Sequence, residues 1–173
     1  AVQEKVHYEQ RPHLFRNLEG GARFEDVAES AGFTDALVGR GAAYGDLDGD
    51  GDLDVVMTSN GGRARVYRND SSAANALRVQ LRGDRSSADA IGALVTVVAG
   101  EDTQTQAARA GGSYCSQSEA ALTFGLGAAE TATRVDVAFP SGRAYSYNHV
   151  AAGQTIEVVE GEGLTRQWGF DTP

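Results

Sequence analysis

The stretch Asp46-Leu-Asp48-Gly-Asp50-Gly-Asp52-Leu-Asp54 places five carboxylates within nine residues of a 173-residue chain. Carboxylates this close together repel one another unless a cation lies among them. Oxygen ligands favour a hard cation, and the alternation of aspartate with glycine and leucine lets a loop wrap around one ion. The stretch therefore predicts a Ca²⁺ site.

The flanking sequence decides which kind of calcium loop this is. An EF-hand needs a bidentate glutamate at loop position 12, and here that position is Met57. The apolar run at 53–57 and the small residues at 39–45 both favour strands, so we expect a strand–loop–strand site. Its alternative is a solvated acidic hairpin turn. The expected ligands are the side chains of Asp46, Asp48, Asp50 and Asp54, and the backbone carbonyl of Asp52.

The composition favours β-structure and excludes several classes of protein. Glycine is frequent at 22 residues and proline is rare at 3, which is typical of strands joined by tight turns. The net charge of −9, without a basic face, argues against a nucleic-acid partner. No apolar run is long enough to predict a membrane span. Cys115 stands alone, so neither a disulfide nor a zinc site is expected, and we predict that it is a small core residue.

An internal repeat suggests the organisation of the first half. Leu14-Phe-Arg-Asn17 returns as Val66-Tyr-Arg-Asn69, 52 residues later, and a period near 50 is typical of one propeller blade. After an N-terminal lead at 1–13, we expect a four-stranded blade at 14–72, with strands at 23–27, 40–45, 53–58 and 66–69. A lone blade has unpaired edges, so upstream blades, the second domain or a second copy in a homodimer would have to cover them.

The second half predicts a different all-β domain. After a linker at Ser71–Ala74, short segments alternate apolar and polar residues between turns, which is typical of a β-sandwich. We expect this β-sandwich-like domain at 76–160, followed by a tail at 161–173 that docks through Trp168 and Phe170 or stays loose. The seven predicted strands lie at 76–82, 91–99, 103–110, 121–124, 133–139, 143–147 and 155–159.

These motifs also carry a resemblance to known families. The first half resembles a VCBS or FG-GAP repeat at Leu14–Asn17, Phe24–Val27, Gly39–Ala43, Gly45–Asp54 and Tyr67–Asn69. The second half resembles the ASPIC/UnbV domain at Ile91–Ala93, Gly112–Tyr114, Ser116–Ser118, Phe124–Gly127 and Phe139–Gly142. The order of the two resembles the C-terminal part of cartilage acidic protein-like proteins and their bacterial relatives. Departures are Ser87-Ala-Asp89, where the family commonly has Asn-Arg-Asp, and Cys115, where it often has leucine.

The resemblance implies a secreted, extracellular or periplasmic module that binds calcium and is not an enzyme. It leaves the role of the ASPIC/UnbV domain open, and our main hypothesis for the module is binding or cell adhesion, with a protein or glycan partner. Arg82-Gly-Asp84 is an adhesion tripeptide if it is exposed on a loop. Two rivals stay open: an enzyme or accessory protein of secondary-metabolite biosynthesis, and a structural C-terminal cap of a longer propeller. For the enzyme, Ser113 or Cys115 would have to meet His149 in space.

Overall fold

The computed structural model describes residues 8–70 and 75–170, and the predicted linker Ser71–Ala74 lies outside them. The described chain is all-β, as the sequence predicts, with one 3-10 turn, η1, at Glu19–Gly21. None of its helical segments is long and apolar enough to cross a bilayer. The strands are β1 Phe15–Leu18, β2 Arg23–Asp26, β3 Gly39–Gly45, β4 Asp54–Ser59, β5 Arg65–Tyr67, β6 Asn75–Arg82, β7 Leu94–Ala99, β8 Asp102–Ala107, β9 Leu122–Gly127, β10 Thr131–Ala138, β11 Ala144–Ala151, β12 Gln154–Val159 and β13 Gly163–Gly169.

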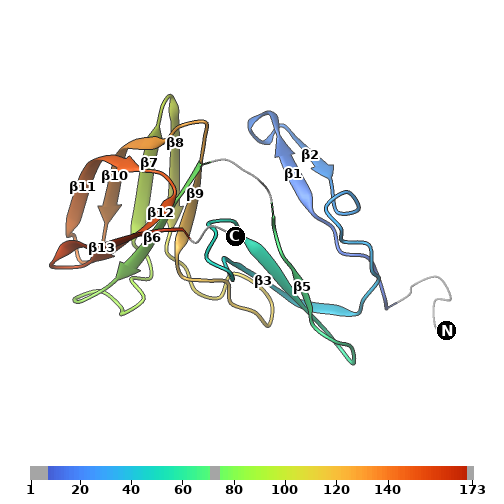
Figure 1. Cartoon of the computed structure of the whole chain (residues 1–173). Coiled ribbons are helices and arrows are strands. Elements are labelled where there is room, and N and C mark those ends of the chain that lie inside the picture. The colour runs from blue at the N-terminus through green and yellow to red at the C-terminus, as the bar shows by residue number, and fades with distance from the viewer. Residues whose placement is uncertain (1–7, 71–74, 171–173) are drawn as a thin grey trace.

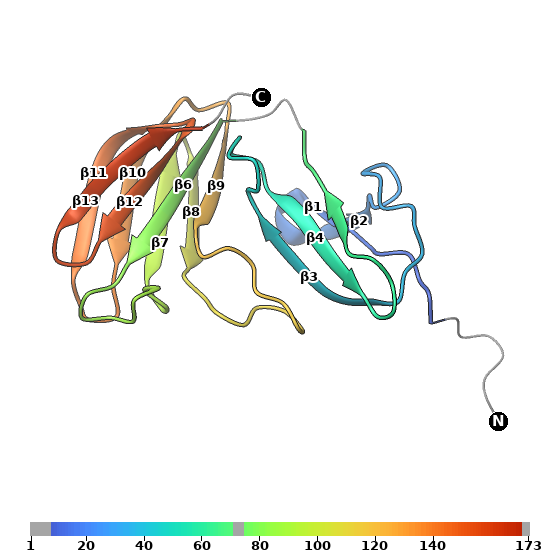
Figure 2. The same ribbon diagram turned by 60° about the horizontal axis from the view of Figure 1, so that its bottom comes forward.

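Two four-stranded sheets form a sandwich in the C-terminal half. One sheet has the order β11-β10-β7-β8, and the other has the order β13-β12-β6-β9. Figures 1 and 2 show the two sheets as the layers of one body, with β8 and β9 on the side nearer the N-terminal strands. All seven strands predicted for 76–160 are present. The tail adds the strand β13, which the sequence did not predict.

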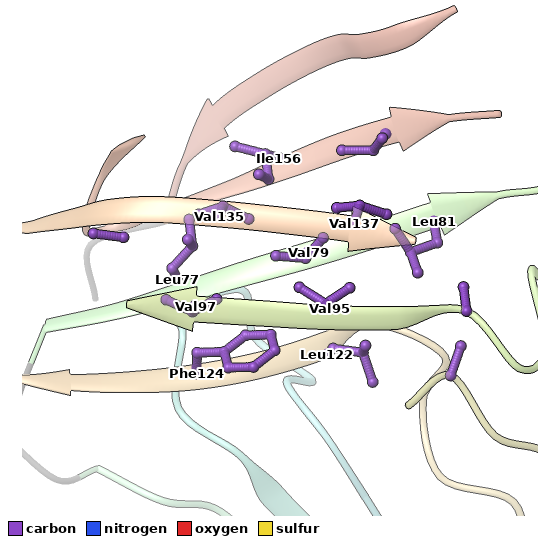
Figure 3. Close-up of a cluster of buried hydrophobic side chains, with 14 of the residues drawn as sticks. Leu77, Val79, Leu81, Val95, Val97, Leu122, Phe124, Val135, Val137 and Ile156 are labelled. Atoms are coloured by element: carbon purple, nitrogen blue, oxygen red, sulfur yellow. The ribbon is translucent and has the colours of Figure 1, made fainter. Parts of the chain in front are cut away.

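The core of the sandwich follows largely from alternation of buried and outward-facing residues along its strands. Leu77, Val79 and Leu81 of β6 are buried while the residues between them face outward, and β7 and β10 repeat the pattern. Phe124 of the edge strand β9 lies opposite Leu77 of β6 and belongs to the same cluster (Figure 3). Burial of these aliphatic side chains is the main source of stability, because each contributes roughly 1.5–3 kcal/mol relative to exposure.

The N-terminal strands form two smaller sheets instead of the expected four-stranded blade. β2 pairs with β1 in a two-stranded hairpin, while β3, β4 and β5 form a separate three-stranded sheet. The four strands predicted for the blade therefore do not share one sheet. The local hairpin of β1 and β2 closes a short loop at little entropic cost, which favours this pairing.

A loop of the sandwich covers the edge of β3 that a fourth strand would have used. The hydroxyl of Ser116 donates to the carbonyl of Ala42 at 2.8 Å, and the N–H of Glu119 donates to the carbonyl of Tyr44 at 3.0 Å. The N–H of Tyr44 donates to the hydroxyl of Ser118 at 3.2 Å. A Cβ at Gly41 would lie 2.9 Å from the carbonyl oxygen of Cys115, so this close approach requires glycine. The C-terminal half thus covers this edge, one of the three expected ways.

Candidate metal centre

The aspartate-rich loop joins β3 to β4 and brings three of its carboxylates together. Each of Asp46, Asp48 and Asp50 offers an oxygen within 4.8 Å of the oxygens of the other two. This carboxylate trio, as we call it below, contains three of the five residues that the sequence predicts as calcium ligands.

Asp46 is the fixed member of the carboxylate trio. Its side chain is fully buried, and Oδ1 accepts a hydrogen bond from the N–H of Gly49 at 2.7 Å. Oδ2 accepts from the N–H of Gly51 at 3.0 Å and from Nη1 of Arg78 at 2.9 Å. The loop is therefore folded around this carboxylate, which holds its turns in place.

Asp54 and Asp52 lie outside the carboxylate trio. Asp54 is buried, and its two oxygens accept from the N–H groups of Leu47 and Asn69, each at 2.8 Å. It closes the base of the loop and ties it to the chain after β5. The N–H of Asp52 donates to Oδ1 of Asp50 at 2.9 Å, which orients that member of the trio. The ligand roles of Asp52 and Asp54 stay a prediction.

Glycine at position 51 lets the loop pack against the C-terminal strand. Gly51 has a φ of 92°, and a Cβ there would lie 2.3 Å from the ring of Phe170. The ring of Phe170, which follows β13, thus contacts the backbone of the loop directly. The predicted docking of the tail through its aromatic residues is confirmed for Phe170.

Two residues of the C-terminal half, one basic and one acidic, form ion pairs next to the loop. The sequence analysis did not predict either residue. Arg78 of β6 is only 14% exposed and also donates through Nη2 to Glu119, so the guanidinium lies between two carboxylates. Burial raises the pKa of Glu119, although the neighbouring Arg78 charge and the main chain of Asp46 oppose the rise.

The carboxylate trio fits a hard cation such as Ca²⁺ by its chemistry. Its donors are oxygens alone, they belong to one glycine-rich loop, and Asp48 is exposed enough for an ion to reach it. Partial burial raises the pKa of Asp48, and the charge of Asp50 adds to this effect. Such repulsion is relieved when a cation binds between the carboxylates. The bound ion would be held by Asp46, Asp48 and Asp50 with further oxygens from the loop or from water.

The structure does not bring together the residues weighed for nucleophilic catalysis. Ser113 and Cys115 lie in the loop between β8 and β9, whereas His149 lies on β11, the edge strand at the other side of the sandwich (Figure 1). Cys115 is exposed, with a φ of 50°, so its prediction as a core residue was wrong. Arg82 and Asp84 are exposed, as an adhesion tripeptide would require.

The sandwich is similar to a known protein family. Its residues 83–165 match the family model described as ASPIC and UnbV. Residues 83–165 are an ASPIC/UnbV domain. Among curated proteins, no sequence matches the chain.

The match confirms the C-terminal half of the resemblance. It spans β7 to β12 and the start of β13, a little under half of the chain. Strand β6 precedes the matched residues but lies in the middle of its sheet, between β12 and β9. Arg78, which contacts the aspartate-rich loop, therefore belongs to a strand that completes the ASPIC/UnbV sandwich.

Proposed function

We propose that this chain is a secreted calcium-binding β-module that serves in extracellular binding or adhesion and catalyses no reaction. The carboxylate trio of Asp46, Asp48 and Asp50 is the observation that carries the proposal. Carboxylates this close together repel one another, and a divalent cation between them offsets the repulsion. The ion stabilises the loop that packs against Arg78 and Phe170.

The N-terminal part supports a relation to VCBS or FG-GAP repeats through its sequence motifs. The calcium loop of such repeats would correspond to Gly45–Asp54, between β3 and β4. Together with the ASPIC/UnbV domain, this order is the one found in cartilage acidic protein-like proteins, which suggests the same extracellular or periplasmic location.

Calcium should bind to the folded chain and raise its melting temperature. At a calcium concentration ten times the dissociation constant, binding adds about 1.4 kcal/mol to the free energy of unfolding. For a chain of this size the melting temperature should rise by about 3–6 °C. Calorimetric titration with Ca²⁺ and melting curves with and without a chelator measure the two effects.

Matched variants locate the ion. Asp48→Asn keeps the shape of an exposed trio member but removes its charge, so it should weaken calcium binding at least tenfold. Asp35→Asn removes a charge from the exposed ion pair with Arg65, which has no trio member in it, and should leave calcium binding unchanged. Absence of binding at 10 mM Ca²⁺, or equal affinity in wild type and Asp48→Asn, would overturn the calcium proposal.

The wide separation of Ser113 and Cys115 from His149 supports the non-catalytic part of the proposal. A nucleophile needs a base within hydrogen-bond reach, at about 2.6–3.2 Å or through one water. Opposite sides of a sandwich do not provide this proximity. Turnover of an ester, glycoside or phosphate panel that is lost on Ser113→Ala would contradict it.

A second candidate function is that of a structural cap, which covers other β-sheet surfaces. The exposed aromatic residues of the hairpin formed by β1 and β2 favour this function. Phe15 and Phe24 are about 60% exposed, and their register places both on one face of the hairpin. Two exposed rings on a small sheet are typical of a surface that another element covers. Without such an element, we expect the isolated chain to dimerise through these rings.

Sedimentation velocity tests this candidate. Wild type at about 100 µM should sediment as a dimer, and the double variant Phe15→Ser, Phe24→Ser should sediment as a monomer. The double variant Leu94→Ser, Leu164→Ser, which removes two exposed apolar side chains of the sandwich, is the control and should stay dimeric. A monomeric wild type would remove the support for a cap.

A further inference from the structure

A cavity of about 710 Å³ lies where the three-stranded sheet meets the ASPIC/UnbV domain. Ala42 and Tyr44 of β3 and Leu53 form one wall, and residues 105–107 of β8 with the loop at 109–121 form the other. The hydrogen bonds of Ser116, Ser118 and Glu119 to β3 fix the distance between these walls. The cavity is therefore a built feature of the contact between the two halves.

We propose that this cavity binds an acidic saccharide, a polyhydroxylated ligand that carries a carboxylate. The proposal deepens the extracellular binding role proposed above and depends on that role, but it does not depend on the cation. It rests on three properties of the cavity: the amides and hydroxyls in its lining, its single unpaired cation among the described residues, and the already occupied edge of β3.

The lining is suited to hydroxyl groups. Side-chain amides and hydroxyls, among them Gln106, Gln117, Ser113 and Ser118, line the wall beside alanine and leucine side chains. Tyr44 is 54% exposed and offers a flat aromatic face. A sugar ring places its C–H face on such a ring and its hydroxyls toward amides, which are both donors and acceptors.

The floor of the cavity contains polar atoms that lack a partner. Oε1 of Glu119 and Oγ1 of Thr123 are buried and have no hydrogen-bond partner among the residues that the structure describes. Buried polar atoms without a partner are costly and rare. A hydroxyl-rich ligand can supply the missing donors through a bridging water.

Arg109 determines the charge of the ligand. It lines the cavity, is exposed, and forms no ion pair within the described part of the chain. The one acidic side chain of the lining, Glu119, is already paired with Arg78. In a chain with a net charge of −9, this free guanidinium is a local site for a carboxylate, which it can bind with two parallel hydrogen bonds.

The main-chain groups along the edge of β3 are already hydrogen-bonded, which favours a saccharide ligand over an extended acidic peptide. A peptide that adds a strand to a sheet edge needs free main-chain N–H and C=O groups. The N–H and C=O of Tyr44 and the C=O of Ala42 are already bonded to the loop at 116–119. The remaining ligand-binding groups are side chains, which suits a ligand recognised by its hydroxyls and its carboxylate.

The experiment uses the full chain and a glucuronic-acid-containing disaccharide, with its neutral glucose counterpart as the comparison. Calorimetric titration in the presence of a chelator should detect the acidic disaccharide, at least tenfold tighter than the neutral one. Arg109→Gln and Tyr44→Ala should each weaken binding at least tenfold, and Arg109→Lys should weaken it less. Arg63→Gln, in the exposed turn between β4 and β5, is the matched control and should change affinity less than twofold.

The outcomes separate this inference from the calcium proposal. Saccharide binding in chelator supports the inference whatever the calcium titration gives. Calcium binding without any saccharide binding at 10 mM overturns only the inference. Equal affinity for the acidic and neutral sugars, or a loss in Arg63→Gln that equals the loss in Arg109→Gln, overturns it as well. Arg109-dependent binding of a glutamate-rich peptide in place of the sugar would also overturn it. Unchanged melting curves for each variant show that the protein is still folded.

Discussion

Replacement of Arg78 by methionine should lower the free energy of unfolding by about 3 kcal/mol, because removal of one partner leaves buried charges uncompensated. The guanidinium is 14% exposed and lies between Asp46 and Glu119, which are themselves buried or nearly so. Methionine keeps most of the side-chain volume, so the loss would report on charge and hydrogen bonds. Chemical denaturation at neutral pH measures the difference.

The control for Arg78 is an arginine with a similar pairing but an exposed position. Arg134 of β10 pairs with Asp136 at 2.8 Å and is 54% exposed, so Arg134→Met should cost no more than about 0.5 kcal/mol. Hydrogen exchange adds a local readout, since Arg78→Met should expose the N–H groups of Gly49 and Gly51 that bond to Asp46. Equal stability of the two variants would show that the buried ion network contributes little.

Replacement of Glu160 by glutamine should lower the melting temperature by roughly 10 °C. Glu160 is buried, and its Oε2 accepts from the N–H groups of Asp84, Arg85 and Ser86 at 2.7–2.8 Å. Its Oε1 accepts from the hydroxyls of Ser86 and Ser141. This carboxylate joins three turns of the sandwich, and the amide of glutamine brings N–H groups where only acceptors fit. Glu162→Gln, two residues away and exposed, should leave the melting temperature unchanged.

The carboxylate of Glu160 should also make the stability of the fold depend on pH in the acidic range. Burial alone would raise the pKa of Glu160, but hydrogen bonds from Ser141, Ser86 and Asp84 outweigh it and lower the pKa to about 2. A carboxyl group whose pKa is lower in the folded state than in the unfolded state stabilises the fold at pH values above its unfolded-state pKa. This contribution is lost as the pH falls toward 2. Wild type should therefore lose stability between about pH 4.5 and 2 more steeply than Glu160→Gln. Parallel acid limbs for the two proteins would contradict the assignment.

The sequence predicts local patterns well, and the structure shows why. Short apolar or alternating segments between turns predicted all seven strands at 76–160, because most of these strands bury one face in the core. Strand β13 has only Leu164 and Trp168 as large apolar residues and both of its ends are glycine, so its sequence lacks that alternation. The aspartates of the carboxylate trio were predictable because all the information lies in nine consecutive residues.

Long-range pairings were not predictable from the same patterns. The missing fourth strand of the blade is replaced by residues 116–119, which lie 74 positions after β3 and have no strand pattern. Arg78 lies 32 positions from Asp46, and Glu119 lies 41 positions from Arg78. A single polar residue on the outer face of a strand gives no indication of its distant partner.

The position of β6 in the middle of its sheet constrains the order in which the molecule can be completed. Strand β6 pairs in parallel with β12, and this pairing places Leu77 opposite Gln154, 77 residues later. Every other described pairing of strands is antiparallel. Such distant pairing makes folding slow, because a long segment must be ordered before the contact forms. On a ribosome, β6 emerges early but cannot be fully paired until β12 has been synthesised. The aspartate-rich loop, which depends on Arg78 of β6, would then be among the last parts of the protein to reach its final environment.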